Sequence, residues 1–202
     1  MKQPKLIALD CDDVLLDYNK EWGKIYTDFF SLNEIQPVNT RAYHADNYWG
    51  VDWINRKEEE KKFLQHFHNH GWKNMEALDG AIEGTKLLRK NGYKIFVISR
   101  MPESVEKDRT ENLKKLGFEF DSVIGTGHSK DKNHNPKKSY IEALRPDYFV
   151  DDLVANFHGI NTTTQFVWLD LNKQHKENDD LRKKIKIHHI HKNLLSFVET
   201  IT

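Results

Sequence analysis

Residues 5–16 are Lys-Leu-Ile-Ala-Leu-Asp-Cys-Asp-Asp-Val-Leu-Leu, an apolar run followed at once by carboxylates. The continuous apolar stretch from Leu6 to Leu9 is typical of a strand that is buried on both faces of a parallel sheet. Such a strand delivers Asp10, Asp12 and Asp13 to the carboxyl edge of the sheet, where open α/β folds bind their ligands. Because neighbouring acids repel one another, we expect a hard cation such as Mg²⁺ among them.

From residue 79 onward the chain alternates between apolar, β-branched runs and amphipathic stretches. The runs predict strands at residues 93–98, 118–124, 148–150, 165–171 and 185–190. The amphipathic stretches predict helices at residues 81–91, 103–116 and 137–144, and a last helix that Asn193 caps and that extends to about residue 201. This alternation predicts an α/β fold with a Rossmann-like, doubly wound parallel sheet.

Residues 17–78 depart from this pattern, because they are rich in aromatic residues and contain no strand-like run. Trp22, Tyr26, Phe29 and Phe30 recur at helical spacing, and residues 52–70 also have the pattern of a helix. We therefore predict a helical cap at residues 17–78, inserted into a core that consists of residues 1–16 and 79–202. A chain of 202 residues is long enough for one such domain with an insertion.

The composition disfavours several classes of protein. Lys and Arg total 31, as do Asp and Glu, so the net charge of zero gives no electrostatic reason to expect nucleic-acid binding. No apolar stretch approaches the roughly 20 residues that span a bilayer, and the short segment before the first strand leaves no room for a signal peptide. A single cysteine suits a reducing compartment. We therefore expect a cytoplasmic protein that acts on a small molecule, without a nucleic-acid or membrane partner.

Several polar residues fall at the carboxyl ends of predicted strands, or open a helix at the same edge: Asp10 and Asp12, Ser99, Lys137 and Lys138, and Asp151 and Asp152. In a doubly wound fold this edge is one place in space. The acids can bind Mg²⁺, while the metal, a lysine and the Ser99 hydroxyl can bind a phosphoryl group. The pattern therefore predicts a site for metal-assisted phosphoryl chemistry.

In order and spacing these residues resemble the four motifs of the haloacid dehalogenase-like (HAD) superfamily. The first motif, an apolar strand followed by Asp-x-Asp-x-Val/Thr, is matched by residues 10–14, and the second, a strand ending in Ser or Thr, by residues 95–99. A lysine at a helix start, Lys137 or Lys138, matches the third motif, and the acidic pair at residues 151 and 152 matches the fourth. The resemblance covers the whole chain except the predicted cap.

The resemblance implies a role for each motif residue. Asp10 would be the nucleophile that forms an aspartyl-phosphate, and Asp12 the acid that protonates the leaving oxygen and then the base that activates water. Mg²⁺ would be held by Asp10, the backbone carbonyl of Asp12 and Asp152, with Asp151 either a further ligand or a partner of the ligands. Ser99 would donate to a phosphoryl oxygen, and a lysine would neutralise charge between nucleophile and phosphate.

Three details refine the expectation. Members of the superfamily that act on carbon–halogen bonds, or that pump ions, lack an acid two residues after the nucleophile, so Asp12 indicates phosphate-ester hydrolysis. The next position is often glycine, and Asp13 replaces it here in a turn that tolerates aspartate. The lysine stays open between Lys137 and Lys138, and Asn156, four residues after Asp152, is placed to support the metal ligands by hydrogen bonding.

The substrate is expected to be a small phosphorylated metabolite. An aromatic cap suits a flat leaving group, and the chain is similar to the 5′(3′)-deoxyribonucleotidase branch, which implies a nucleoside monophosphate. The aromatic residues outside the helical register, Tyr43, Tyr48 and Trp49, are the expected substrate contacts, together with Arg100. The alternatives are a sugar-phosphate phosphatase and a non-catalytic binding or regulatory protein that keeps the fold.

Overall fold

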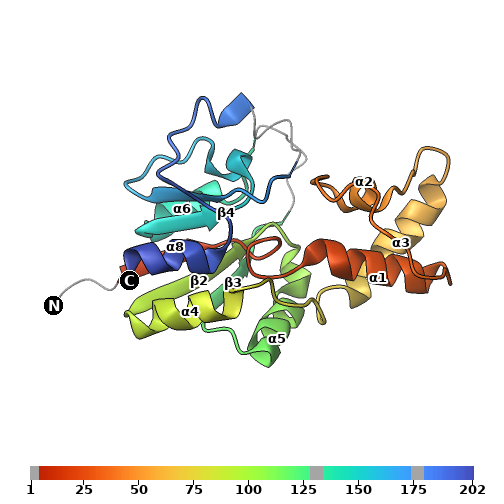
Figure 1. Cartoon of the computed structure of the whole chain (residues 1–202), viewed down its shortest axis with the longest axis horizontal. Coiled ribbons are helices and arrows are strands. Elements are labelled where there is room, and N and C mark those ends of the chain that lie inside the picture. Colours follow the sequence, from red (N-terminus) through yellow and green to blue (C-terminus); the bar gives the residue numbers. More distant parts are fainter. Residues whose placement is uncertain (1–4, 128–133, 174–179) are drawn as a thin grey trace.

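A computed structural model describes residues 5–127, 134–173 and 180–202 of the chain. Within these residues, six strands form one sheet in the order β3-β2-β1-β4-β5-β6 (Figure 1). The strands are β1 (Lys5–Leu9), β2 (Tyr93–Ser99), β3 (Ser122–Gly125), β4 (Tyr148–Asp151), β5 (Gln165–Leu169) and β6 (His189–His191). Every neighbouring pair runs parallel, which confirms the predicted Rossmann-like α/β fold.

The strand order reverses at β1, and this reversal positions the acids. The chain proceeds outward from β1 through β2 to β3, and then returns to pair β4 with the other side of β1. In such sheets the crevice at the reversal is where ligands bind. Leu9 pairs with Val150, and the Asp10 N–H donates to the Val150 carbonyl at 2.9 Å. Asp10 and Asp151 therefore leave neighbouring strands side by side.

Helices cover both faces of the sheet. Ile7 and Leu9 of β1 belong to one apolar cluster, with residues of α4, α5 and α8, whereas Ala8 belongs to a second, with residues of α6 and η2. These elements are α4 (Ala81–Lys90), α5 (Glu106–Leu116), α6 (Lys138–Leu144), α8 (Leu194–Ile201) and the 3₁₀ turns η1 (Glu103–Val105) and η2 (Val154–Phe157). The alternation along β1 confirms that this strand is buried on both sides.

Three strands are shorter than the sequence predicts, and one of them, β5, ends at Leu169 and not at residue 171. Phe118, the first residue of the predicted strand 118–124, instead donates its N–H to the Leu113 carbonyl and closes α5 behind Gly117. Asp121 accepts from the Ile95 N–H, so the chain reaches the sheet edge just before β3 begins at Ser122. The last strand was predicted at residues 185–190, but only residues 189–191 form a ladder with β5.

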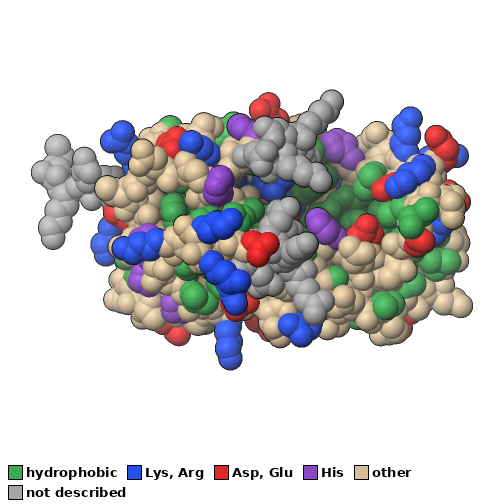
Figure 2. Space-filling model, turned by 90° about the horizontal axis from the view of Figure 1, so that it is seen from above, with side chains coloured by type: hydrophobic (Ala, Val, Ile, Leu, Met, Phe, Trp, Pro, Cys, Tyr) green, Lys and Arg blue, Asp and Glu red, His purple; other side chains and the backbone are tan. Residues whose placement is uncertain are grey.

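The segment between β1 and α4 is helical, as predicted. It contains α1 (Tyr18–Phe29), α2 (Ala45–Trp49) and α3 (Lys57–His70), which lie together at one end of the molecule (Figure 1). Their core is aromatic: Phe63 packs edge-on against Trp22, with ring centroids 4.8 Å apart, and also against Tyr26 and Trp53. The surface is hollowed over this end, and hydrophobic side chains line the hollow (Figure 2). None of the described helices is both long and apolar enough to cross a membrane.

Substitution of Gly23 by alanine is expected to destabilise the protein, although alanine favours helices by about 1 kcal/mol. Gly23 lies in α1 against the indole of Trp49, and a methyl group there would overlap the indole ring. We expect Gly23→Ala to lower the free energy of unfolding by about 1–3 kcal/mol in urea, the usual cost of overpacking. In a Trp49→Ala background the same substitution should cost nothing, and a similar loss in both backgrounds would contradict the packing argument.

Candidate active site

Lys137 occupies the centre of the site. Its ammonium lies 2.7 Å from Asp10 Oδ1 and 2.6 Å from Asp151 Oδ2, and its side chain is fully buried. It immediately precedes α6, which starts at the same edge of the sheet as the ends of β1 and β4. Lys138, by contrast, is 46% exposed and lies 3.9 Å from Glu142. Of the two lysines that the sequence leaves open, the structure thus brings Lys137 to the acids.

Both carboxylate oxygens of Asp151 accept hydrogen bonds from neighbouring residues. One oxygen accepts from Lys137, and the other accepts from the Asn156 amide and the Leu153 N–H, both at 2.9 Å. Asn156 thus makes the hydrogen bond to the acidic pair that the sequence suggests. Burial raises the pKa of Asp151 to about 6, although Lys137 acts in the opposite direction. Asp151 is therefore arranged chiefly as an anchor for Lys137.

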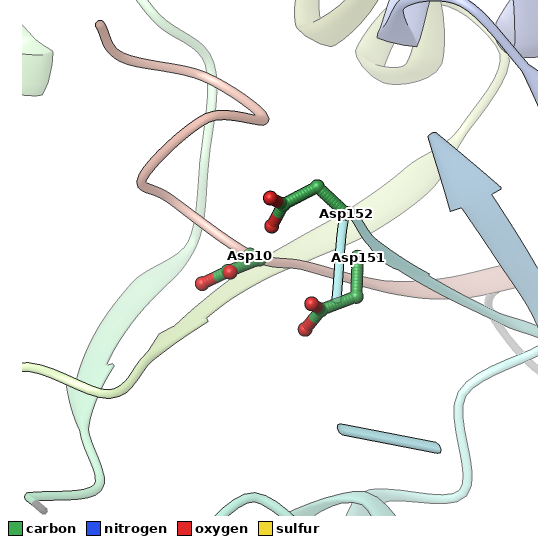
Figure 3. Close-up of side chains that lie close together, drawn as sticks. All are labelled: Asp10, Asp151 and Asp152. Atoms are coloured by element: carbon green, nitrogen blue, oxygen red, sulfur yellow. The ribbon is translucent and has the colours of Figure 1, made fainter. Parts of the chain in front are cut away.

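Asp152 completes a cluster of carboxylates. Asp10, Asp151 and Asp152 each offer an oxygen within 4.8 Å of the others, and the three side chains lie together where the two strands end (Figure 3). Burial raises the pKa of Asp152 well above its usual range, and the charges of Asp13, Asp151 and Asp10 raise it further. Mutual repulsion of this kind is relieved by a cation, and an all-oxygen donor set is the kind that Mg²⁺ accepts.

Asp12 forms an ion pair with a buried arginine, Arg109, which the sequence analysis does not identify as a site residue. Arg109 of α5 donates to Asp12 Oδ1 at 2.6 Å, and its own side chain is completely buried. Burial raises the pKa of Asp12 to about 6, while Arg109 lowers it, so the carboxyl can carry a proton near neutral pH. A signal was present in the sequence, because Arg109 shares the inward stripe of its helix with Leu113 and Leu116.

Asp13 adopts a left-handed backbone conformation, with φ of 60°, which explains why glycine is common at this position. The aspartate that replaces glycine here forms a mostly buried ion pair with Lys173, in the segment that follows β5. The same ammonium lies 6.0 Å from the ring centroid of Tyr43 in the cap. Arg41, beside Tyr43 in sequence, donates to Asn172. Neither Lys173 nor its contacts could be anticipated from a local pattern.

The three aromatic residues predicted to contact the substrate are placed differently. Tyr43 lies near the acids, because the Lys173 ammonium that pairs with Asp13 is 6.0 Å from its ring centroid. Burial raises the pKa of the Tyr43 hydroxyl, and the charges of Asp152 and Asp151 raise it further. Trp49 donates its indole N–H to the Asn19 carbonyl at 2.8 Å, and Tyr48 packs against Trp49. The structure therefore brings Tyr43 to the cluster, whereas the other two rings take part in the packing of the cap.

Two buried donors at the end of β2 have no partner. The Ser99 hydroxyl and the Arg100 Nε are both buried, and neither forms a hydrogen bond with any described residue. Buried polar atoms are nearly always paired, so these two are expected to have a ligand. β2 is the neighbour of β1, and in the register of the sheet Leu9 pairs with Val97, two residues before Ser99. An anion bound beside Asp10 would satisfy such donors.

Three described cations pair with the acids: Arg109 with Asp12, Lys137 with Asp10 and Asp151, and Lys173 with Asp13. The carboxylates of Asp10, Asp151 and Asp152 together offer an all-oxygen donor set, which fits a hard divalent cation.

Comparison with known proteins identifies the fold. No protein-family model matches the sequence, and no curated protein matches it. Among solved structures, a haloacid dehalogenase-like hydrolase from Streptococcus pneumoniae superposes over the full length of both chains, with a TM-score of 0.65 and 13% identity. A predicted phosphoglycolate phosphatase from Haemophilus somnus also covers 100% of both chains, with a TM-score of 0.65 and 14% identity.

A further similar structure is the HAD-hydrolase YfnB from Bacillus subtilis, which is bound to magnesium. It covers 99% of both chains, with a TM-score of 0.64 and 12% identity. Other structures of this fold that match over nearly the whole chain are dehalogenases. At such identities the likeness is one of fold and not of activity. The protein has the fold of the haloacid dehalogenase-like hydrolases.

Proposed function

We propose that the protein is a metal-dependent phosphatase that hydrolyses small phosphomonoesters through an aspartyl-phosphate on Asp10. The unpartnered Ser99 and Arg100 donors carry this proposal. They lie at the end of the strand next to Asp10, in a site that is otherwise rich in carboxylates and therefore repels anions. Donors left free in such a place suit a phosphoryl group, whose charge Lys137 and a metal would offset.

The proposed reaction has two steps. Asp10 attacks the phosphorus, the bond to the ester oxygen breaks, and that oxygen takes the proton of Asp12. Water then attacks the phosphorus and gives a proton to Asp12, and the bond between phosphorus and Asp10 breaks to release phosphate. Lys137 keeps Asp10 oriented and neutralised, and Ser99 donates to a phosphoryl oxygen.

We propose Mg²⁺ as the metal, held by Asp10, Asp152 and the backbone carbonyl of Asp12. Asp151 would support the site through Lys137, since its oxygens already accept three hydrogen bonds. When bound, the ion would supply positive charge to the phosphoryl oxygens. The three carboxylate oxygens within 4.8 Å of one another support a divalent ion, and a solved structure of similar fold is bound to magnesium.

Dehalogenases share this fold, so the reaction class needs a separate argument. Asp12 favours a phosphatase, because a phosphatase uses an acid two residues after the nucleophile, and the pKa of Asp12 is raised as such an acid requires. The resemblance implies that a dehalogenase would lack an acid at this position. Among phosphomonoesters we propose nucleoside monophosphates, because the Tyr43 ring lies 6.0 Å from the Lys173 ammonium that pairs with Asp13, and an aromatic ring near the acids could stack on a base. Sugar phosphates are the alternative.

We also propose a cytoplasmic location. The single cysteine of the chain, Cys11, is buried and free, which is in keeping with a reducing compartment.

The proposed reaction is tested by Mg²⁺-dependent turnover of a panel of substrates. We expect the native protein to hydrolyse p-nitrophenyl phosphate, and deoxynucleoside monophosphates with a higher kcat/KM than sugar phosphates, while 2-haloacids stay intact. Asp10→Asn should abolish turnover, because an amide cannot form the phosphoenzyme. Equal kcat/KM values for nucleotides and sugar phosphates would contradict the substrate class alone. A native protein without Mg²⁺-dependent turnover would contradict the reaction and favour a non-catalytic role.

Lys137 and Lys138 provide a matched pair of variants. Lys137→Met should lower kcat by about 10²-fold or more, the scale of removing one preorganised charge from an active site. Lys138→Met removes the same charge one residue away, from a half-exposed side chain beside Glu142, and should leave kcat within about twofold. Phosphatase assays on both variants, with thermal unfolding to verify folding, would decide the assignment. Similar losses in the two variants would overturn it.

Metal binding should be visible without any turnover. Because the pKa of Asp152 is raised on folding, the folded protein retains a proton that the unfolded chain releases. In EDTA, stability should therefore fall as pH rises above about 4, and Asp152→Asn should be more stable than the native protein at neutral pH. Mg²⁺ at a hundred times its Kd should stabilise the native protein by about 2.7 kcal/mol and Asp152→Asn much less. Calorimetry that shows equal Mg²⁺ effects would exclude Asp152 as a ligand.

A further inference from the structure

Arg109 is a charged residue that is completely buried in the described part of the chain and that the proposed reaction does not use. It lies in α5, and no part of its side chain is exposed. One terminal nitrogen donates to Asp12, the other lies 2.9 Å from the Met75 sulfur, and the guanidinium stacks over the Trp72 ring at 5.0 Å. Its position is thus fixed on three sides by contacts from different parts of the chain.

Stability does not explain why a charge is buried here. Its Nε has no hydrogen-bond partner among the described residues, and Asp12 provides the ion pair. A buried ion pair is often no more stable than apolar side chains of the same size, because both charges lose their hydration. Leucine or methionine would suit this stripe of α5, which continues with Leu113. The presence of arginine at this position therefore suggests a functional role that acts on Asp12.

We propose that Arg109 is a positioning residue that fixes Asp12 in the orientation from which it protonates the leaving oxygen. The inference rests on the proposed phosphatase function. Arg109 cannot touch the substrate, since it is wholly buried behind Asp12, whereas the Asp12 side chain is 26% exposed. The guanidinium holds one Asp12 oxygen, and in this proposal the other oxygen carries the proton for the leaving group.

The chemistry of the first step explains what Arg109 contributes. When Asp12 gives its proton to the leaving oxygen, the carboxyl becomes a carboxylate, and the Arg109 N–H donates to that charge at a fixed angle. A guanidinium suits this task better than an ammonium, because its planar donors hold a carboxylate in one orientation. Met75 and Trp72 fix the plane of the group, and Asn112 of α5 donates to the Met75 carbonyl at 3.1 Å.

The inference predicts an effect that depends on the leaving group. Phenolate leaving from phenyl phosphate needs a proton, whereas p-nitrophenolate leaves readily without one. For Arg109→Met we expect kcat/KM to fall about 10²-fold with phenyl phosphate, the lower end of general-acid catalysis, and at least about tenfold less with p-nitrophenyl phosphate. Arg109→Lys should show the same bias with a smaller loss. A structural role alone would lower both values by one factor, and that result would overturn the proposal.

A double-substitution cycle tests whether Arg109 acts through Asp12. In an Asp12→Asn background, Arg109→Met should change the residual kcat/KM for p-nitrophenyl phosphate by less than about twofold, whereas independent effects would multiply. Arg89→Met is the matched control, because it also removes an arginine–aspartate pair, with Asp121, but far from the acids. It should leave the ratio of the two esters unchanged.

The outcomes separate this proposal from the one on which it rests. If the native protein hydrolyses neither ester with Mg²⁺, the phosphatase function itself fails. If it hydrolyses both but the Arg109 variants show no bias between the esters, only the role of Arg109 fails. If Arg109→Met does not fold, the bias is measured on Arg109→Lys, which keeps the charge and loses the planar donors.

Discussion

One ammonium group buried between two carboxylates holds the site together. Lys137 contacts Asp10 at the end of β1 and Asp151 at the end of β4, and so ties α6 to both strands. A buried charge without its partners costs several kcal/mol, so each of these side chains depends on the other two. The contact exists only because the sheet order places β4 directly beside β1. Every other feature of the site is positioned relative to this triad.

Around the triad, carboxylates crowd one another. Burial raises the pKa of Asp152, and the charges of Asp13, Asp151 and Asp10 raise it further. Such a cluster lowers stability, and a bound cation would relieve the repulsion. Active sites often carry strain of this kind, which the rest of the fold offsets. Here the offset comes from a sheet buried on both faces and from an aromatic cap core.

The sequence was a good guide where local patterns determine structure, and a poor one where they do not. The apolar run before Asp10 and the apolar run that ends at Ser99 each predict a strand from a few adjacent residues, and the structure confirms both strands. The choice between Lys137 and Lys138 depends on the residue at which α6 begins, because each step along a helix rotates the side-chain direction by about 100°. The sequence does not determine that residue. The pairs of Asp12 with Arg109 and of Asp13 with Lys173 join residues 97 and 160 positions apart. A local pattern can place Arg109 on the inward face of its helix, but it cannot identify the partner of either cation.

The distance along the chain between β1 and β4 also bears on how the protein is made. Leu6 of β1 donates its N–H to Asp147, which lies 141 residues later. Closing so long a loop carries an entropic cost that grows with its length, and non-local pairings of this kind form slowly. During synthesis, β2 and β3 leave the ribosome before Lys137, Asp151 and Asp152, so Asp10 is made long before the residues that it contacts in the folded protein. The candidate active site is therefore complete only after β4 has joined the sheet. A chain truncated before β4 would keep Asp10 and Lys137 but would lack Asp151, the second partner of that lysine.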